Sequence, residues 1–232
     1  MPSYTLFHGS EQIIQTPLYG FGSIHNDYGQ GFYCSCDYEL AGEWACKNGA
    51  DGFINKYVIY DKGLKVLNLS DGNHTVLEWI TLLLKNRIFR LSSEISRNAR
   101  DYLLANFDVT LSGYDIVSGY RADDSYFQYA SAFIENTLSL QGLSKAMTLG
   151  KLGTQTVLLS PKAFDAISFD GFDFAAADDY YPAYCSRDES ARQAYVKSIK
   201  NNATYAKDLF IIDILREEIK RDDARIQRII PK

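Results

Sequence analysis

The sequence contains little cysteine and little proline, with four and five residues of these types among 232. The cysteines form no Cys-x-x-Cys pair, which argues against a zinc site, and no cluster of His, Cys and Asp indicates another metal. Four scattered cysteines in a chain of this length are typical of reduced, buried residues rather than of a disulfide scaffold. We therefore expect no metal site and four buried thiols.

Long hydrophobic runs are also missing. The longest apolar stretch, around Trp79, is broken by Thr81 and ends at Lys85, so it is too short to span a bilayer. Residues 1–8 have neither the basic region nor the apolar region of a secretion signal. These absences predict no association with a membrane and a location in the reduced cytoplasm.

The sequence has fewer basic than acidic residues. The 24 Lys and Arg residues against 29 Asp and Glu give a formal net charge of −5 at pH 7. Duplex nucleic acid is bound by neutralising phosphates over a broad basic surface, so this balance argues against duplex DNA as a partner. A small local site for single-stranded RNA stays open.

Aromatic residues are abundant, at 14%, which suits β-rich structure and aromatic-lined pockets. Apolar periodicity and turn residues predict strands over residues 4–8, 31–36, 54–60, 64–67, 114–117, 156–159 and 164–169. They predict helices over residues 38–48, capped by Asp37, over 92–106, 125–140 and 143–149, and from Ser70-Asp71 onward. The simplest interpretation is one α+β domain over residues 1–232, with a helical insertion at about 70–106 and C-terminal helices at about 187–230.

Three short segments carry the candidate chemistry. In Phe7-His8-Gly9-Ser10, a His at a strand end precedes a Gly that lets a ligand approach the backbone; the alternative is a capped strand end. In Asp27-Tyr28-Gly29-Gln30-Gly31-Phe32-Tyr33, the glycines indicate a tight turn before a strand, without the further glycines and helix of a phosphate loop. Trp44 follows on the predicted helix. The rings of Tyr33 and Trp44 would sandwich a flat ligand, unless Trp44 belongs to the core.

Together these segments resemble the catalytic core of the ADP-ribosyltransferase superfamily, in its diphtheria-toxin-like and poly(ADP-ribose)-polymerase-like branch. His8-Gly9-Ser10 matches the His-Gly-Thr/Ser of its first strand, and the segment from Tyr28 to Tyr33 matches its Tyr-Gly-Lys-Gly-Ile-Tyr-like motif. Trp44 stands where a second aromatic follows, and Gln155 stands where a Glu opens a late strand. Over most of residues 1–170 the chain also resembles an uncharacterised bacterial family assigned to this fold.

The resemblance implies a split β-sheet and NAD as the substrate. It puts the His8 side chain on a ribose hydroxyl and the backbone of Gly9 on the nicotinamide carboxamide. It puts Tyr33 and Trp44 against the nicotinamide ring, where aromatic faces attract the positively charged leaving group. It gives the third catalytic position to Gln155, beside His8 and Tyr33. The further contacts that it implies come from Ser10, Tyr28, Gly31 and, for the NAD pyrophosphate, Arg121.

Gln155 departs from the superfamily pattern. A Glu would stabilise a cationic transition state by its charge, whereas Gln accepts a hydrogen bond but takes no proton. Loss of this Glu goes with loss of chain elongation in the superfamily, so single ADP-ribose transfer is expected rather than polymer synthesis. Asp123 or Asp124 would supply the missing carboxylate; alternatively, this pair forms a turn or caps the helix that follows.

The resemblance therefore predicts a mono-ADP-ribosyltransferase whose acceptor is a protein, a nucleic acid or a small molecule. Stand-alone bacterial members are often toxins of toxin–antitoxin or phage-defence systems, which adds a neutralising antitoxin protein as a candidate partner. Three alternatives stay open: a catalytically inactive module that binds NAD or ADP-ribose, an NAD glycohydrolase, and a structural or interaction domain.

Overall fold

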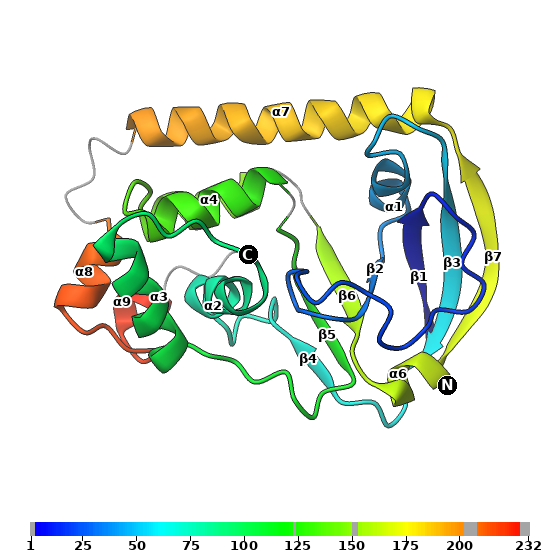
Figure 1. Cartoon of the computed structure of the whole chain (residues 1–232), viewed down its shortest axis with the longest axis horizontal. Helices are drawn as coiled ribbons and strands as arrows, with labels where there is room; N and C mark the ends of the chain where they lie inside the picture. Colours follow the sequence, from blue (N-terminus) through cyan, green and yellow to red (C-terminus); the bar gives the residue numbers. More distant parts are fainter. Residues whose placement is uncertain (1–2, 123, 150–152, 202–207, 228–232) are drawn as a thin grey trace.

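The computed structural model describes residues 3–122, 124–149, 153–201 and 208–227. It is built on a seven-stranded sheet with the order β4-β5-β6-β2-β1-β3-β7 (Figure 1). β4 and β5 run parallel, and the other neighbouring strands are antiparallel. The strands are β1 (Ser3–Ser10), β2 (Phe32–Ser35), β3 (Gly52–Tyr60), β4 (Val66–Asn68), β5 (Ile116–Tyr120), β6 (Thr154–Leu158) and β7 (Ile167–Ala175). The predicted α+β class is confirmed.

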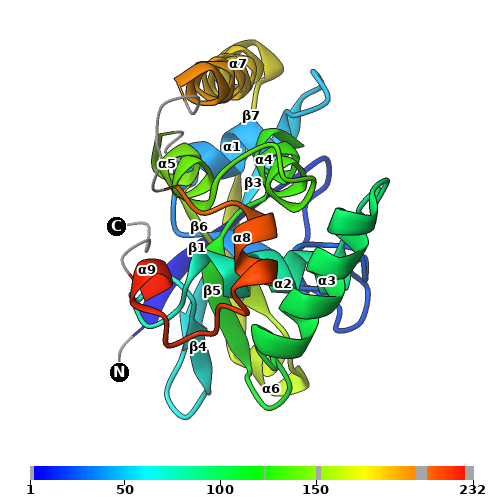
Figure 2. The same ribbon diagram turned by 90° about the vertical axis from the view of Figure 1, so that its left-hand side faces the viewer.

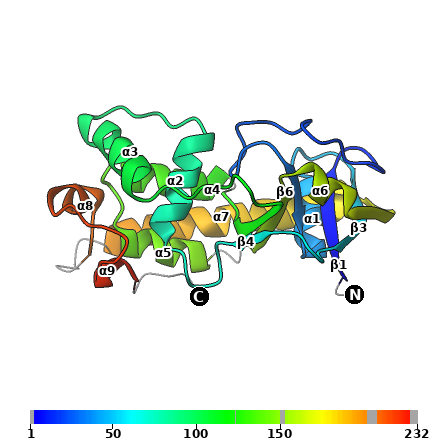
Figure 3. The ribbon, with the colours of Figure 1, turned by 90° about the horizontal axis from the view of Figure 1, so that it is seen from below.

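One half of the molecule consists mainly of helices, and the other half consists mainly of strands. The helices are α1 (Tyr38–Ala45), α2 (Val76–Asn86), α3 (Glu94–Asn106), α4 (Asp124–Ile134), α5 (Leu140–Leu149), α6 (Pro161–Asp165), α7 (Ala177–Asn201), α8 (Ile211–Arg216) and α9 (Ala224–Gln227). The helices α2, α3, α4, α5 and α8 gather beside the β4–β5–β6 end of the sheet (Figure 2). The long α7 runs past both halves and packs on α1, α4 and α5 (Figure 3).

The largest buried apolar cluster lies in the helical half. It joins Trp79 and Leu83 of α2 to Phe133 of α4 and to Val157 of β6. Burial of apolar surface is the dominant favourable contribution to folding, so this cluster fixes the helices on one end of the sheet. The predicted insertion at about 70–106 therefore enlarges the core, because Leu103 of α3 also belongs to the cluster.

Two helix starts show how side-chain hydrogen bonds set boundaries. Asp37 caps α1 as predicted, with its Oδ1 accepting from the Leu40 N–H at 3.1 Å. The helix expected from Ser70-Asp71 begins instead at Val76, so that prediction was wrong. The Asp71 side chain accepts from the Asn73 N–H at 2.9 Å and so favours a turn over a helix. The chain then enters α2 where the Thr75 N–H donates to the Glu78 carboxylate at 2.7 Å.

The strand predicted over residues 164–169 was also wrong in its position. Ser160 caps a short helix, α6, and Pro161 occupies its first turn, where a proline is tolerated. The strand that follows, β7, runs from Ile167 to Ala175 along the outer edge of β3. α7 then begins at Ala177, about ten residues before the predicted C-terminal helices.

The prediction of four buried thiols is correct for two of the cysteines. Cys34 and Cys46 are buried, as predicted, but Cys36 and Cys185 are exposed, and all four are free thiols. Cys36 lies between the end of β2 and the start of α1, where the chain is at the surface. Within the described ranges, no helix combines the length and the apolar character needed to cross a bilayer.

Candidate functional site

A cavity of about 470 Å³ opens where β1, β2, α1 and the loop over residues 11–31 meet. Its volume is within the range of small-molecule sites. The loop contains neither helix nor strand, and it forms one wall of the cavity through Ile14, Leu18 and Phe21. Structureless loops of this length are uncommon in compact domains and are usually functional when they occur. The cavity is therefore the candidate ligand site.

Three neighbouring strands bring the three predicted catalytic residues to this cavity. His8 lies on β1, Tyr33 on β2 and Gln155 on β6, and each lines the cavity. Ser35 of β2 stands opposite Gln155 on one side and opposite Phe7 on the other. Phe7 with Ser35 is the single registered pair between β1 and β2, so these strands diverge beside it. The cavity occupies this divergence.

The His8 imidazole is fixed by one hydrogen bond and one ring contact. Its Nδ1 lies 2.6 Å from the Tyr33 carbonyl oxygen, and because a carbonyl only accepts, Nδ1 carries the hydrogen. The ring packs on Phe32 with 4.6 Å between centroids. Burial lowers the pKa of His8 below its ordinary value, and the hydrogen bond to Tyr33 opposes that shift. Neutral His8 therefore keeps its Nε2 as a hydrogen-bond acceptor.

Gly9 also lines the cavity, but its lack of a side chain serves the packing of α1. A Cβ on Gly9 would lie 1.9 Å from the Ala41 carbonyl oxygen and 2.7 Å from the Ala45 nitrogen. The helix thus rests directly on the strand, and this contact places Trp44 beside the cavity. The sequence alone suggested that the glycine admits a ligand; the space of its missing side chain belongs to α1.

Tyr33 closes the turn that precedes its own strand. Its hydroxyl donates to the Gly29 carbonyl oxygen at 2.7 Å and accepts from the Tyr28 N–H at 2.9 Å. Gly29 has φ +76°, a left-handed conformation that favours glycine, so the predicted tight turn is confirmed. The same side chain therefore lines the cavity and holds residues 28–33 in place.

Two residues of the predicted ligand set lie away from the described lining of this cavity. Tyr28 is 2% exposed, and its hydroxyl donates to the Tyr120 carbonyl oxygen at 2.8 Å, so it is a core residue. Ser10 Oγ bonds to the Gln12 backbone and faces an adjoining hollow of about 350 Å³. Gly31, by contrast, does line the cavity.

Two cations lie against the Trp44 ring. Lys47 Nζ is 4.3 Å and Arg121 Cζ is 4.9 Å from the ring centroid. Arg121 is buried, and all three residues line the cavity. Stacking of Trp44 on a flat ligand would compete with these cation–π contacts, whereas the two cations suit a ligand that carries phosphate.

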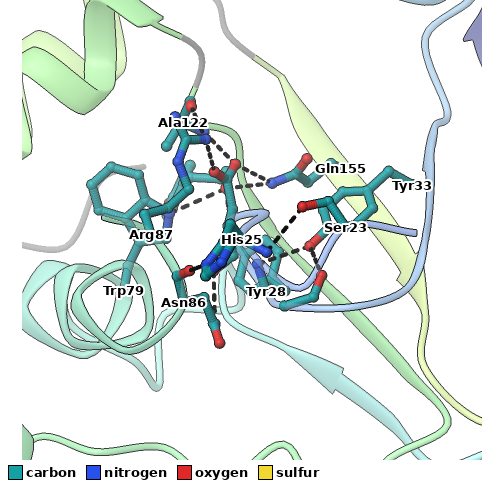
Figure 4. A network of polar contacts seen from close by, with 12 residues as sticks. Ser23, His25, Tyr28, Tyr33, Trp79, Asn86, Arg87, Ala122 and Gln155 are labelled. Atoms are coloured by element: carbon teal, nitrogen blue, oxygen red, sulfur yellow. Dashed lines mark hydrogen bonds and ion pairs between the residues drawn. The ribbon is translucent and has the colours of Figure 1, made fainter. Parts of the chain in front are cut away.

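Gln155 makes its hydrogen bonds through its amide nitrogen. Nε2 donates to Asp27 Oδ2 at 2.8 Å and to the Tyr120 carbonyl oxygen at 3.3 Å. The same carbonyl receives the Trp79 indole N–H at 3.1 Å, which ties the strand end to α2 (Figure 4). Gln155 is buried, so these contacts fix the direction in which its amide points.

Asp27 opens the candidate segment that runs to Tyr33, but its carboxylate was not predicted to belong to the site. It is 6% exposed and lines the cavity. Its oxygens accept from Arg87 Nη1, the Ala122 N–H and Gln155 Nε2, each at 2.8 Å. Burial raises the pKa of Asp27 above its ordinary value, while these hydrogen bonds and the charge of Arg87 oppose the shift. The carboxylate beside Gln155 thus comes from the loop before β2.

The acidic residues that were predicted for this role are placed elsewhere or not described. Asp123 lies outside the described residues, and Asp124 is the first residue of α4, where its side chain is likewise outside what the structure describes. The sequence contains one local signal for each member of the Asp27–Arg87 pair. Asp27 directly precedes Tyr28-Gly29, and Arg87 directly follows α2. Neither spacing indicates that the two residues touch.

The charges around the cavity differ from those of the whole chain. Among the described lining residues, Lys47, Arg87 and Arg121 are basic and Asp27 is acidic. The chain has a net charge of −5, so this basic lining is a local feature. Arranged around aromatic and apolar walls, it suits a ligand that combines a flat ring with an anionic group. In the described part of the chain, no three His, Cys, Asp or Glu side chains gather as metal ligands.

The family model described as "Protein of unknown function (DUF3990)" matches residues 4–169. The chain belongs to this family. The match covers His8, Tyr33, Asp27 and Gln155 and ends within β7, so α7, α8 and α9 lie beyond it. No curated protein and no solved structure matches the chain.

Proposed function

We propose that the protein is an NAD-dependent mono-ADP-ribosyltransferase with the split-sheet fold of that superfamily. The observation that carries the proposal is the meeting of His8, Tyr33 and Gln155 on three adjacent strands around one cavity. The three residues come from distant parts of the sequence, so their convergence does not follow from motif spacing. The divergence of β1 from β2 at this point supports a split sheet.

The hydrogen-bonding state of His8 supports NAD as the substrate. Its Nδ1–H is used by the Tyr33 carbonyl, and its lowered pKa keeps Nε2 neutral near pH 7. An acceptor nitrogen at a cavity wall is the partner that a ribose hydroxyl needs, because the hydroxyl then donates. The cations beside Trp44 support the same substrate, since NAD carries a pyrophosphate.

In the proposed reaction, the bond between C1′ of the ribose and the nicotinamide nitrogen breaks. Nicotinamide leaves with the bonding electron pair, and a nucleophile of the acceptor forms the new bond to C1′ and releases a proton. Positive charge develops on the ribose as the bond breaks, so electron-rich groups around it lower the barrier. The aromatic face of Tyr33 is one such group at the cavity wall.

The test is the release of nicotinamide from NAD by the purified protein, with and without cell lysate as a source of acceptor. His8→Ala removes the acceptor nitrogen. His25→Ala is the matched control, because His25 is exposed and lies outside the cavity lining. Release that requires lysate and falls at least tenfold in His8→Ala alone supports transfer, and label carried over from NAD identifies the acceptor.

A second candidate is a module that binds NAD or ADP-ribose without cleaving it, and the neutral Gln155 favours it, because an amide takes no proton. Binding of NAD in a calorimeter without nicotinamide release would assign this role. Release without lysate would assign hydrolysis, with water as the acceptor. Neither binding nor release would contradict every NAD-based proposal.

A further inference from the structure

The buried carboxylate of Asp27 has more donors than an ion pair needs. Arg87 Nη1 donates to Oδ1 at 2.8 Å. Oδ2 receives two further donors, the Ala122 N–H and the Gln155 amide, both at 2.8 Å. Hydrogen bonds to a carboxylate favour its ionised form, so these donors offset part of the desolvation that burial imposes. The site therefore places a carboxyl group, held by three donors, next to its neutral third residue.

Gln155 gains a fixed orientation from this contact. Its amide has two N–H hydrogens, and two acceptors receive them, Asp27 Oδ2 and the Tyr120 carbonyl oxygen. If the amide turned over, its oxygen would face both of these oxygens. In Figure 4 the nitrogen of Gln155 carries the dashed contacts and the oxygen points away from them. Oε1 is therefore the acceptor atom that Gln155 offers to the cavity.

We propose that Asp27 is a positioning residue of this site: it holds Gln155 by its amide nitrogen, so that Oε1 accepts a ribose hydroxyl of NAD. This inference rests on the proposed function. It explains why a carboxyl group lies within one hydrogen bond of Gln155, the residue at the third catalytic position. Loss of Asp27 lets the amide turn, and a misplaced acceptor of this kind lowers a rate by about tenfold to a hundredfold.

A purely structural clamp is the competing explanation. The Asp27–Arg87 pair, and the Asn86 side chain that donates to the Asp27 carbonyl oxygen at 3.1 Å, already fasten the loop to the end of α2. A clamp of this kind has no need of Gln155, which reaches Asp27 from β6. The two explanations differ in whether the effects of Asp27 and Gln155 depend on each other.

A double-mutant cycle of Asp27→Asn and Gln155→Ala, measured on nicotinamide release, tests the proposal. Each single variant is expected to lower kcat about tenfold or more while KM for NAD stays within about threefold. The double variant should then be at most about twofold slower than the slower single variant, since both act on one acceptor atom. Losses that multiply in the double variant would overturn the proposal.

Asp173→Asn is the matched control for the cycle. Asp173 accepts from the Tyr38 hydroxyl at 2.7 Å and pairs with Lys56 at 2.6 Å, but it lies outside the cavity lining. Its variant therefore loses a similar set of polar contacts without touching the site. We expect its kcat to stay within about twofold of the wild type, and a loss as large as that of Asp27→Asn would contradict a specific role for Asp27.

A pH profile keeps the proposal testable if Asp27→Asn does not fold. Protonation of Asp27 releases the Gln155 amide, so kcat falls on the acid side; His8 adds a second acidic titration of its own. The other titratable groups that face Asp27 are Arg87, Tyr28 and Tyr33, and burial raises the pKa of both tyrosines. At pH values below the pKa of Asp27 and that of His8, log kcat of the wild type should fall by about two per pH unit. In Gln155→Ala only the titration of His8 still acts, so log kcat should fall by about one per pH unit. Equal slopes would overturn the proposal.

The wild type separates failure of this inference from failure of the proposed function. If it neither binds nor cleaves NAD, both are wrong. If it cleaves NAD and the losses of the cycle multiply, the inference alone is wrong. If it binds NAD without cleavage, the same cycle is measured on Kd by calorimetry, where a non-additive loss supports the role of Asp27 and an additive loss contradicts it.

Discussion

The cavity has two sides that are built in different ways. On the strand side, His8, Tyr33 and Gln155 take their places from the ladder of β1, β2 and β6. On the loop side, Asp27 and Arg87 meet through side-chain hydrogen bonds between segments without regular structure. The strand side offers neutral acceptors and rings, and the loop side supplies charge. The difference shows that backbone pairing sets the frame of this site while its electrostatics depend on a few side-chain contacts.

The two sides therefore respond to different kinds of substitution. The strand side depends on close packing, because α1 rests on the backbone of Gly9 with no room for a methyl group. The loop side depends on keeping a buried charge paired, because Asp27 is 6% exposed. Substitutions that remove one type of interaction and leave the other intact measure each side separately.

The largest expected effect is on the strand side, for Gly9→Ala. The new Cβ would lie 1.9 Å from the Ala41 carbonyl oxygen, so the strand or α1 must move. We expect the free energy of unfolding to fall by about 3 kcal/mol or more, measured by urea denaturation. Gly113→Ala is the control: its φ is +88° but nothing lies near a Cβ, so about 1–2 kcal/mol is expected. An equal loss in both variants would mean that α1 adapts at little cost.

The next effect is on the loop side, for Arg87→Met. This change leaves the Asp27 carboxylate buried without its cation, and we expect a loss of about 2–3 kcal/mol in the free energy of unfolding. Adding Asp27→Asn should recover part of that loss, because no buried charge then remains. Arg225→Met breaks an exposed pair with Asp223 and should change stability by less than about 1 kcal/mol. A similarly small loss for Arg87→Met would show that backbone contacts hold the loop side.

The strand side was largely predictable from the sequence because its signals are local. Alternating apolar residues predicted β1, β2 and β3, and the side chain of Asp37 marked the start of α1. His8 and Tyr33 stand inside short motifs, so their types and spacing could be read directly. Gln155 was found only because a resemblance supplied the position at which to look.

The loop side was not predictable, because its contacts join residues far apart in the sequence. Asp27 and Arg87 are separated by three strands and two helices, and no periodicity relates them. Asp123 and Asp124 were chosen instead because they follow a strand directly, which is a local criterion. Tyr28 was assigned to a ligand through the resemblance of its segment, although its ring packs against Gly119 in the core.

The third prediction concerns the turn that links the two sides, and the variant is Tyr33→Phe. It removes the hydroxyl that donates to Gly29 and accepts from Tyr28 while leaving the ring in the cavity wall. We expect a loss of about 1–2 kcal/mol in the free energy of unfolding, and faster amide hydrogen exchange in residues 28–31 than in β2. Uniform exchange in both segments would show that the turn is held by other contacts.

The smallest expected effect is the dependence of stability on pH, which has opposite signs for His8 on the strand side and Asp27 on the loop side. The folded-state pKa of His8 is lowered, so the unfolded chain binds a proton there more readily, and stability falls as pH falls below about 6.5. At pH 6 the loss is at most about 1 kcal/mol. Asp27 acts in the opposite sense, because its folded-state pKa is raised and its contribution to stability is lost as pH rises. His8→Asn can keep a donor to the Tyr33 carbonyl without titrating. The difference between its urea midpoints and those of the wild type, taken from pH 7 to pH 6, therefore isolates the histidine. A difference that does not change with pH would mean that His8 binds protons equally in both states.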